Sequence, residues 1–524
     1  MQDINESAGD QSVPKSKSNF SLLIRILLGF LLSSALFTCM AFQHWTYARK
    51  LKELLPNLIL LPLGGIGLFL LSCLIWRFVP KSGTKKRAVI ILCAALFLYQ
   101  LISAYSYYFL TGWDAMVIRE MSLAFARGDR VLMESWKEYF SIYPNNAMIV
   151  VLLGAVTKLA DLMHLSRIDY FAQIAFQCFL NTLTGFMFFF LIRKVLRDDR
   201  AAAAGFMIYV LLIGLSPWVS IPYSDSIALI FPVSVLLLYF LEQTAPLLNL
   251  MRWFGIFFLS FLGYYIKPQT MIVLIAIILV GILRRIRARA LLKPDLKHIL
   301  GAACACALGT LLALSLAFAA RKALFPDLNP ERALGPSHFL MMGLNQKRNG
   351  SWLKKDVQFS MSRVSKKGRI EDELRVAKER LTEMGAAGLL AHAVRKTLTN
   401  YSDGSFTWGK EGEFFYETFD DATILSRPLK AVFCEPKAAP YKVWVNLLQA
   451  LWMAVLFFSL VSVFTGMRQY AVIWLSVIGI MLFELLFEAR ARYFFHFAPV
   501  IILLAAKGIR DLHKSRSIFL GEGK

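Results

Sequence analysis

The sequence has little charge for its length. Only 18% of its 524 residues are Asp, Glu, Lys or Arg, whereas 57% are hydrophobic and 14% are aromatic. A soluble domain of this length would carry more charge. The charged residues form short clusters between long apolar runs, as loops do between membrane spans. This scarcity excludes an ordinary soluble protein and predicts an all-α protein that crosses a membrane many times.

Acidic residues are scarcer still, with 35 Asp and Glu against 58 Lys and Arg and a net charge of +23. Such an excess would also suit a nucleic-acid-binding protein. However, much of the Lys and Arg flanks apolar runs, where the positive-inside rule places them. No basic soluble domain is separable from these runs. The charge therefore indicates a lipid bilayer as the partner and argues against nucleic acid.

Cysteine is also rare, and the few cysteines form no recognisable site. Six of the seven lie inside apolar runs, and no pair has the spacing of a metal site or a disulfide framework. An internal repeat is missing as well, which weakens an inverted-repeat transporter. The apolar run 21–45 is too long for a signal-peptide core and has no cleavage site, so we expect a retained span.

Thirteen apolar runs are long enough to be considered as spans. They cover residues 21–43, 57–79, 88–110, 146–163, 172–193, 201–219, 226–242, 252–266, 270–284, 298–320, 443–465, 469–488 and 493–508. These runs predict a bundle of about twelve or thirteen transmembrane helices.

Four basic segments should all face the cytoplasm by the positive-inside rule. They are 80–87, 193–200, 284–289 and the tail from Lys507. They share one side only if the run 146–163, which carries charged residues, crosses the membrane partially. We therefore expect twelve full crossings and one partial one. Thirteen full crossings, the alternative, would place the tail outside.

This topology divides the chain into five parts. Within the third part, a helix should run from Gly368 to about Met384 and stop at Gly385. The parts are a cytoplasmic tail (1–20), a membrane module with a first outer loop at 111–145 (21–320), a mixed extracytoplasmic loop domain (321–442), the last membrane helices (443–508) and a cytoplasmic tail (509–524).

Four short polar motifs fall on the outer face in this topology, although none of them was used to derive it. They are Gly112–Asp114, Tyr223–Asp225, Lys267–Gln269 and Glu488–Tyr493. Their convergence indicates a site at the outer edge of the bundle.

Asp114 is the candidate general base of this site. A carboxylate beside Trp113 at the membrane edge would be partly desolvated, which raises its pKa and makes it a better base near neutral pH. The alternative is a solvated loop residue or the N-cap of a helix over 115–127.

The cations of the motifs are candidate phosphate ligands. Glu488 can pair with only one of Arg490 and Arg492, and a spare guanidinium would suit a phosphate. Lys267 would add an ammonium, unless it is a snorkelling anchor. The alternatives for the acids are that Asp225 caps a helix and that Glu484 or Glu488 pairs with the arginines.

The motifs resemble those of the GT-C superfamily of polyprenyl-phosphate-sugar glycosyltransferases, such as protein O-mannosyltransferases and aminoarabinose transferases. The segment Gly112–Asp114 is similar to the acidic motif in the first outer loop of that group. Tyr143–Asn146, Ile221–Ser226 and Glu488–Pro499 are similar to its later elements. The resemblance covers most of the chain by layout and implies a GT-C-like helical bundle.

The resemblance also implies roles for these residues. Asp114 would activate the acceptor, while Lys267, Arg490 and Arg492 would bind the donor phosphate during an inverting displacement. Ala115 stands where many members have a second acid, so a requirement for a divalent metal is left open, and no cofactor is assigned. The residues assigned to substrate binding are Trp113, Glu120, Tyr143, Tyr223, Asp225, Gln269, Glu488 and Tyr493.

We therefore expect a glycosyltransferase of a bacterial plasma membrane that decorates an envelope glycan, lipid or protein. A polymerase of lipid-linked repeats fits the same layout. Two alternatives from other classes are a lipid-linked glycan flippase and a non-catalytic envelope-assembly subunit. A flippase would keep more charge along a central path within its spans.

Overall fold

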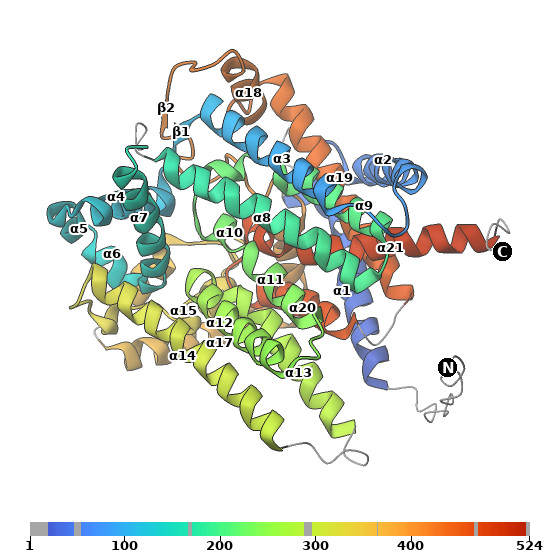
Figure 1. Cartoon of the computed structure of the whole chain (residues 1–524). Helices are drawn as coiled ribbons and strands as arrows, with labels where there is room; N and C mark the ends of the chain where they lie inside the picture. Colours follow the sequence, from blue (N-terminus) through green and yellow to red (C-terminus); the bar gives the residue numbers. More distant parts are fainter. Residues whose placement is uncertain are drawn as a thin grey trace.

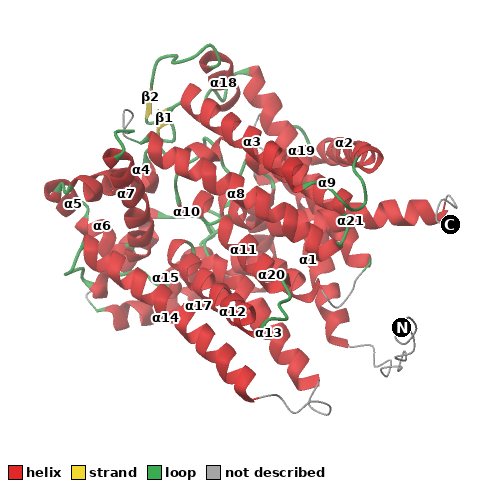
Figure 2. Ribbon diagram, viewed as in Figure 1, coloured by secondary structure: helices red, strands yellow, loops and turns green. Residues whose placement is uncertain are grey.

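The computed structural model is almost entirely helical (Figure 2) and describes residues 19–46, 54–165, 170–287, 296–363, 365–465 and 470–519. Apolar runs fold as helices because a backbone in lipid must satisfy its own hydrogen bonds. Within the described ranges, ten helices are long and apolar enough to cross a membrane, and the shorter apolar helices are Ser224–Phe240 and Ala471–Leu486. The prediction of an all-α polytopic membrane protein is confirmed.

The elements are labelled in Figure 1. The long helices are α1 (Asn19–Thr46), α2 (Asn57–Phe78), α3 (Lys86–Ser106), α7 (Ala147–Leu162), α8 (Phe171–Leu196), α12 (Pro246–Ile266), α13 (Met271–Arg287), α14 (Leu296–Leu324), α17 (Lys366–Tyr401), α19 (Ala439–Phe464), α20 (Ala471–Leu486) and α21 (Ala498–Phe519). The shorter elements are α4 (Trp113–Arg127), α5 (Arg130–Ser135), α6 (Lys137–Ile142), α9 (Asp199–Tyr209), α10 (Ser224–Ile227), α11 (Ile230–Phe240), α15 (Pro336–Gly343), α16 (Lys354–Met361), α18 (Ser426–Phe433), β1 (Phe109–Leu110) and β2 (Glu417–Thr418).

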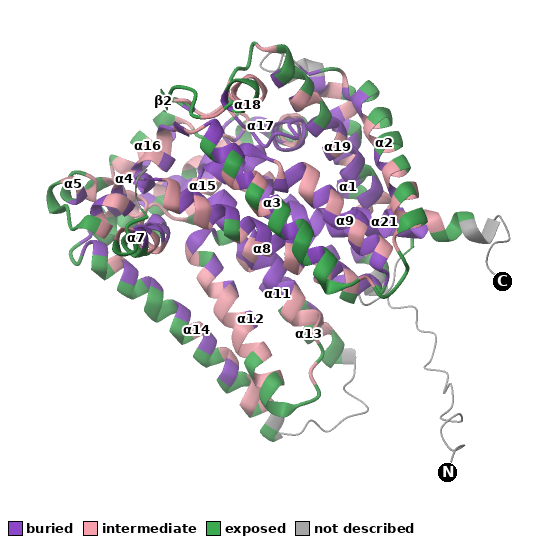
Figure 3. Cartoon of the chain, turned by 45° about the horizontal axis from the view of Figure 1, so that its top comes forward, coloured by how far each residue is buried: buried purple, intermediate pink, exposed green. Residues whose placement is uncertain are grey.

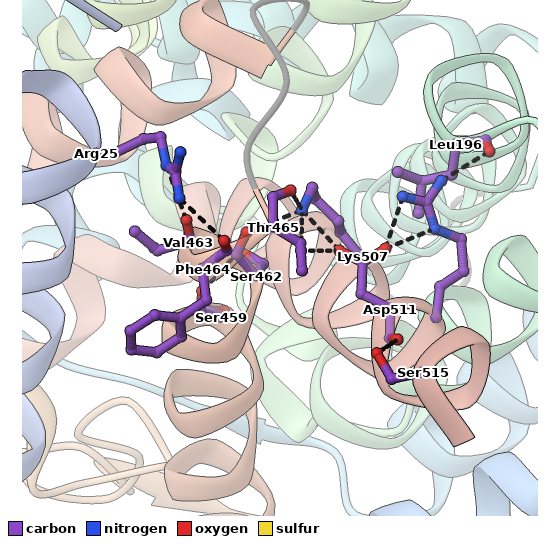
Figure 4. A network of polar contacts seen from close by, with 11 residues as sticks. Arg25, Leu196, Ser459, Ser462, Val463, Phe464, Thr465, Lys507, Asp511 and Ser515 are labelled. Carbon is purple, nitrogen blue, oxygen red and sulfur yellow. Dashed lines mark hydrogen bonds and ion pairs between the residues drawn. The ribbon is translucent and has the colours of Figure 1, made fainter. Parts of the chain in front are cut away.

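The basic segments that precede α3, precede α9 and end α21 meet at one end of the bundle, which we call the basic end. The amide of Asp199 donates to the carbonyl of Lys81 over 2.9 Å. Arg510 donates to the carbonyl of Leu196 over 2.9 Å, and Lys507 donates to the end of α19 (Figure 4). These contacts confirm that the three segments lie together, as the charge pattern predicted.

The opposite end of the bundle, which we call the site end, holds the turns that follow α3, α12 and α20. Because α3 and α8 each run the length of the bundle, the end of α3 lies beside the start of α8. There Ala104, Tyr170, Ile174 and Val219 pack into one small apolar cluster. The prediction for the last part of the basic segment 284–289 lies outside the described residues.

Helix α7 begins and ends near the site end. Asn146, just before it, donates to Tyr139 over 2.8 Å, while Gln173 in the first turn of α8 donates to Thr157 over 2.9 Å. Near its last turn, Asp161 lies 3.7 Å from Arg127 of α4. The helix is long and apolar enough to span a membrane, but it does not connect the two ends. The partial crossing expected for 146–163 stays a prediction.

Two predicted spans are interrupted where the chain turns toward the site. The run 226–242 breaks after Ile227 into α10 and α11. The run 201–219 continues from α9 as a π-helical turn at Val210–Gly214 and a 3₁₀ turn at Pro217–Ser220. Pro217 starts that turn, where its missing N–H costs no hydrogen bond. The interruptions hold Tyr223 and Asp225 within the site end.

The segment 321–442, predicted as a loop domain, divides its buried residues between two hydrophobic cores. Its residues Phe406, Trp408 and Phe414 are buried in the main hydrophobic core, while Met341 and Ala377 belong to a small core of their own. Helix α17 carries the predicted break at Gly385, which has a φ of 58°. A helical segment to Tyr401 follows this break, which the sequence analysis did not foresee.

The C-terminal helix is the most enclosed part of the bundle. In the apolar part of Ala491–Arg516, 94% of the residues are buried, against 17% in α2, α12 and α14. Figure 3 shows the contrast between the buried α21 and the exposed α14. Gly508 allows the close contact of α21 with α19, because a Cβ there would lie 1.9 Å from the carbonyl oxygen of Phe458.

Candidate functional site

The four polar motifs predicted on one face meet at the site end. Each motif lies in or beside the short connection between two helices: α3 to α4, α9 to α10, α12 to α13 and α20 to α21. Side chains from three of these turns form one network of ion pairs with Glu411, which lies on the loop between α17 and β2. Its members are Asp225, Lys267, Glu411, Glu488, Arg490 and Arg492.

Arg492 lies at the centre of this network. Its Nη1 is 3.4 Å from Oδ2 of Asp225, and its Nε is 3.3 Å from Oε1 of Glu411. Asp225 also accepts a hydrogen bond from Lys267. On the other side, Glu411 accepts a 2.6 Å hydrogen bond from Arg490, whose Nε is 3.6 Å from Glu488. The network therefore alternates charges from Lys267 to Glu488.

This geometry corrects three sequence-based interpretations. Helix α10 has Tyr223 as its N-cap, so Asp225 is not a capping residue. Lys267 is only 6% exposed and is paired, so it is not a snorkelling anchor. The expected spare guanidinium is wrong as well, because Glu411 contacts both arginines.

Asp114 lies in the first turn of α4, whose N-cap is Gly112, so the N-cap interpretation of Asp114 is wrong. The side chain is half-buried and shares a hydrogen bond with Tyr139. Burial raises the pKa of Asp114, while the positive charge of Arg492 and the hydrogen bond from Tyr139 oppose this shift. The carboxyl group thus has the raised pKa expected from sequence and lies within the field of Arg492.

Aromatic rings enclose the arginine that links the motifs. The guanidinium of Arg492 lies 4.7 Å from the ring centroid of Trp113, 5.7 Å from that of Tyr223 and 5.4 Å from that of Tyr493. Such cation–π contacts fix a guanidinium without neutralising it. Trp113 has a φ of 47°, a strained backbone conformation of the kind that often marks functional sites.

The remaining predicted residues divide into two groups. Tyr143 hydrogen-bonds with Trp352 and lies within the electrostatic field of Asp114 and Glu488, and Gln269 is buried beside Lys267. Glu120 instead accepts a 3.0 Å hydrogen bond from Trp136 and lies 3.8 Å from Arg119. The contacts of Glu120 therefore join it to the turn between α5 and α6 and to its own helix α4, rather than to the ion-pair network.

Several buried polar atoms at this end have no hydrogen-bond partner within the described ranges. Native proteins satisfy nearly all buried polar atoms, so such a concentration points to a place where a ligand or water binds. The atoms are Trp113 Nε1, Asp225 Oδ2, Gln269 Oε1, Glu411 Oε1, both carboxyl oxygens of Glu484, Arg490 Nε, Arg492 Nε and Nη1, and both ring nitrogens of His496.

Sequence reasoning missed Glu411 and Tyr139. Glu411 lies in the aromatic-rich stretch 406–416, about eighty residues before its partners, and no spacing rule connects it to them. Tyr139 lies in α6, outside the four polar motifs. The described residues contain no group of three His, Cys, Asp or Glu side chains placed to hold a metal ion.

Comparison with known proteins gives one match. A family model described as conserved hypothetical integral membrane protein matches residues 18–511. The comparisons with curated proteins and with solved structures gave no match. The matched range includes α1 to α20, most of α21 and the whole ion-pair network, so the chain belongs to this family of conserved hypothetical integral membrane proteins and is a multi-pass membrane protein.

Proposed function

We propose that the chain is a membrane glycosyltransferase that moves a sugar from a polyprenyl-phosphate donor to an envelope glycan, lipid or protein. The reaction would take place on the extracytoplasmic face of a bacterial plasma membrane. One observation carries the proposal: the Asp114 carboxyl group lies at one edge of a cation cluster that contains Arg490 and Arg492. A base beside buried cations is what transfer from a phosphate leaving group requires.

In the proposed reaction, Asp114 takes the proton of the acceptor hydroxyl. The acceptor oxygen forms a bond to the anomeric carbon as the bond from that carbon to the phosphate oxygen breaks. The electron pair of the broken bond stays on the phosphate, where Lys267 and the two arginines stabilise its charge. The products are a glycosylated acceptor and a polyprenyl phosphate.

The partly exposed residues of the site support access from the surface. Asp114, Tyr139, Tyr143 and Tyr493 are half-buried, and Trp352 is 41% exposed. Lys267 and Arg492 lie deeper, at 6% exposure each. An acceptor could therefore approach Asp114 from outside, while the cations act in a less polar environment where their effect on charge is larger.

The test is sugar transfer from radiolabelled polyprenyl-phosphate sugars in membranes that contain wild type or Asp114→Asn. The substitution keeps the size of the side chain but removes the base, so transfer should fall by about 10²–10⁴-fold. Asp420→Asn, the same change at an exposed position of the outer loop, is the matched control and should transfer like wild type.

Two results would contradict the proposal. If Asp114→Asn transfers sugar at the wild-type rate at equal expression, Asp114 is not the base. If wild type transfers sugar from none of the donors, the result favours a glycan flippase or a non-catalytic assembly subunit. Transport of a lipid-linked glycan into sealed vesicles would then separate these two.

A further inference from the structure

Glu411 occupies the position between the two arginines that the proposed function gives to the donor phosphate. Its Oε2 accepts a 2.6 Å hydrogen bond from Nη1 of Arg490, and its Oε1 lies 3.3 Å from Nε of Arg492. One carboxylate thus bridges two guanidiniums with its two oxygens. A phosphate with two free oxygens would bind the same pair in the same manner.

The charges of the cluster do not permit an added anion. Carboxylates outnumber cations by one in and around this cluster, with five against four. The carboxylates are Asp114, Asp225, Glu411, Glu484 and Glu488, and the cations are Lys267, Lys396, Arg490 and Arg492. A phosphate that entered this buried cluster without any other change would increase its negative charge, which is costly in a place of low polarity. Binding of an anion therefore requires one carboxylate to leave.

Glu411 is the carboxylate best placed to leave, because it lies on a loop between Gly409, with a φ of 72°, and Gly412. The backbone on both sides is held, since Lys410 donates to Asp403 over 2.5 Å and the amide of Gly112 donates to the carbonyl of Glu413 over 2.8 Å. The movement is therefore one of the Glu411 side chain. Asp225, in contrast, lies within a helix and holds Lys267.

Resting on the proposed function, which already takes the donor to be a lipid monophosphate sugar, we propose that Glu411 is an internal substitute for the donor's phosphodiester and leaves the arginines when the donor binds. A phosphodiester has a single negative charge and two non-bridging oxygens, as a carboxylate does. Exchange of one for the other keeps both guanidiniums paired and the charge of the cluster unchanged. A diphosphate would bring at least one further negative charge without a cation to meet it.

The exchange also accounts for release of the lipid product. Transfer converts the phosphodiester into a phosphomonoester, whose charge at neutral pH is about −1.5 to −2. The negative charge of this product is larger than the single negative charge that Glu411 presents to the two arginines. Return of the Glu411 carboxylate to the arginines therefore favours departure of the polyprenyl phosphate.

The experiment measures binding to the purified full-length protein in lipid nanodiscs by calorimetry. The probes are farnesyl methyl phosphodiester, farnesyl diphosphate and farnesol. Wild type should bind the phosphodiester more tightly than the diphosphate and should not bind farnesol detectably. Glu411→Gln removes the competing charge at nearly constant size and should tighten phosphodiester binding about 10-fold. Glu417→Gln, an exposed acid of the same outer loop, is the control and should bind like wild type.

Two further measurements keep failure of this inference separate from failure of the proposed function. Glu411→Asp retains the charge but shortens the reach, so it should tighten phosphodiester binding by less than Glu411→Gln does. Sugar transfer by wild type is read in parallel. If wild type transfers sugar but Glu411→Gln binds the phosphodiester equally or more weakly, Glu411 holds the arginines in place and this inference fails alone. If wild type neither binds the phosphodiester nor transfers sugar, both proposals fail.

Discussion

At the scale of single residues, the ionisation of Asp114 depends on one neighbour that can be removed cleanly. Tyr139 donates a hydrogen bond that lowers the pKa of Asp114 against the effect of burial. Tyr139→Phe should therefore raise that pKa further. Because the base acts only when deprotonated, the acid limb of the pH–rate profile for sugar transfer should move to higher pH.

Initial transfer rates over a pH series measure this shift. Tyr416→Phe, the same change at a 58% exposed tyrosine of the outer loop, should leave the acid limb in place. An acid limb that does not move in Tyr139→Phe would show that another group limits the rate.

A second prediction at this scale concerns Lys396, which is fully buried. Its ammonium donates to the carbonyl of Gly343 over 3.0 Å and to that of Phe487 over 2.5 Å, so it joins α17 to α15 and to the end of α20. Lys396→Met would leave both carbonyls without this donor and should destabilise the protein by about 1–3 kcal/mol.

The melting temperature of the detergent-purified protein reports this change. Lys355→Met, at an exposed position of α16, serves as the comparison. Equal melting temperatures for Lys396→Met and wild type would mean that the two carbonyls find other donors.

The same scale shows where sequence reasoning succeeds and where it stops. The grouping of Asp225, Lys267 and Arg492 was predictable, because each follows or precedes an apolar run at the same end. Their partners were not. Neighbours in sequence suggested Glu488 for the arginines, whereas Glu411 contacts both of them from a distant loop. Pairing across such a separation depends on tertiary packing, which hydropathy does not encode.

At the scale of elements, close contact between helices depends on glycine. A Cβ at position 508 would lie 1.9 Å from a backbone oxygen of α19, and backbone cannot move aside as a flexible side chain can. Gly508→Ala should therefore separate α21 from α19 and destabilise the protein by about 1–3 kcal/mol.

Gly281→Ala is the matched control, since nothing lies within 4 Å of a Cβ at that position of α13. Alanine there should leave the melting temperature unchanged or raise it slightly, because alanine favours helix more than glycine does. If both variants melt like wild type, the contact between α19 and α21 is more adaptable than its geometry indicates.

Most elements were predictable because length and hydropathy define a span. The departures have local causes. The run 226–242 was read as one helix, but the regular α-helix is interrupted at residues 228–229, between α10 and α11. The break at Gly385 was predictable because its positive φ suits glycine. The helix beyond it carries a mixed pattern without an apolar run and gave no such signal.

At the scale of the whole molecule, the two ends of the bundle should face opposite sides of the membrane. Ser82 lies at the basic end and Glu417 in the outer loop, and both are exposed. In intact cells, a membrane-impermeant maleimide should label Glu417→Cys but not Ser82→Cys, in a Cys434→Ala background. Permeabilised cells should allow labelling of both.

Labelling of Ser82→Cys in intact cells would show that the protein has the opposite orientation, with the proposed site facing the cytoplasm. The Cys434→Ala parent provides the background signal. Its six other cysteines lie in α1, α2, α3, α8 and α14, where an impermeant reagent should not reach them.

The enclosure of α21 has a consequence for biosynthesis. Ribosomes make this helix after the other helices that the structure describes, yet 94% of the residues in its apolar part are buried. The helices made earlier must therefore enter the bilayer without their central partner, and lipid or a chaperone must cover the faces of α19 and α9 until it arrives. A nascent chain released before Ala498 would present these uncovered faces to quality-control proteases.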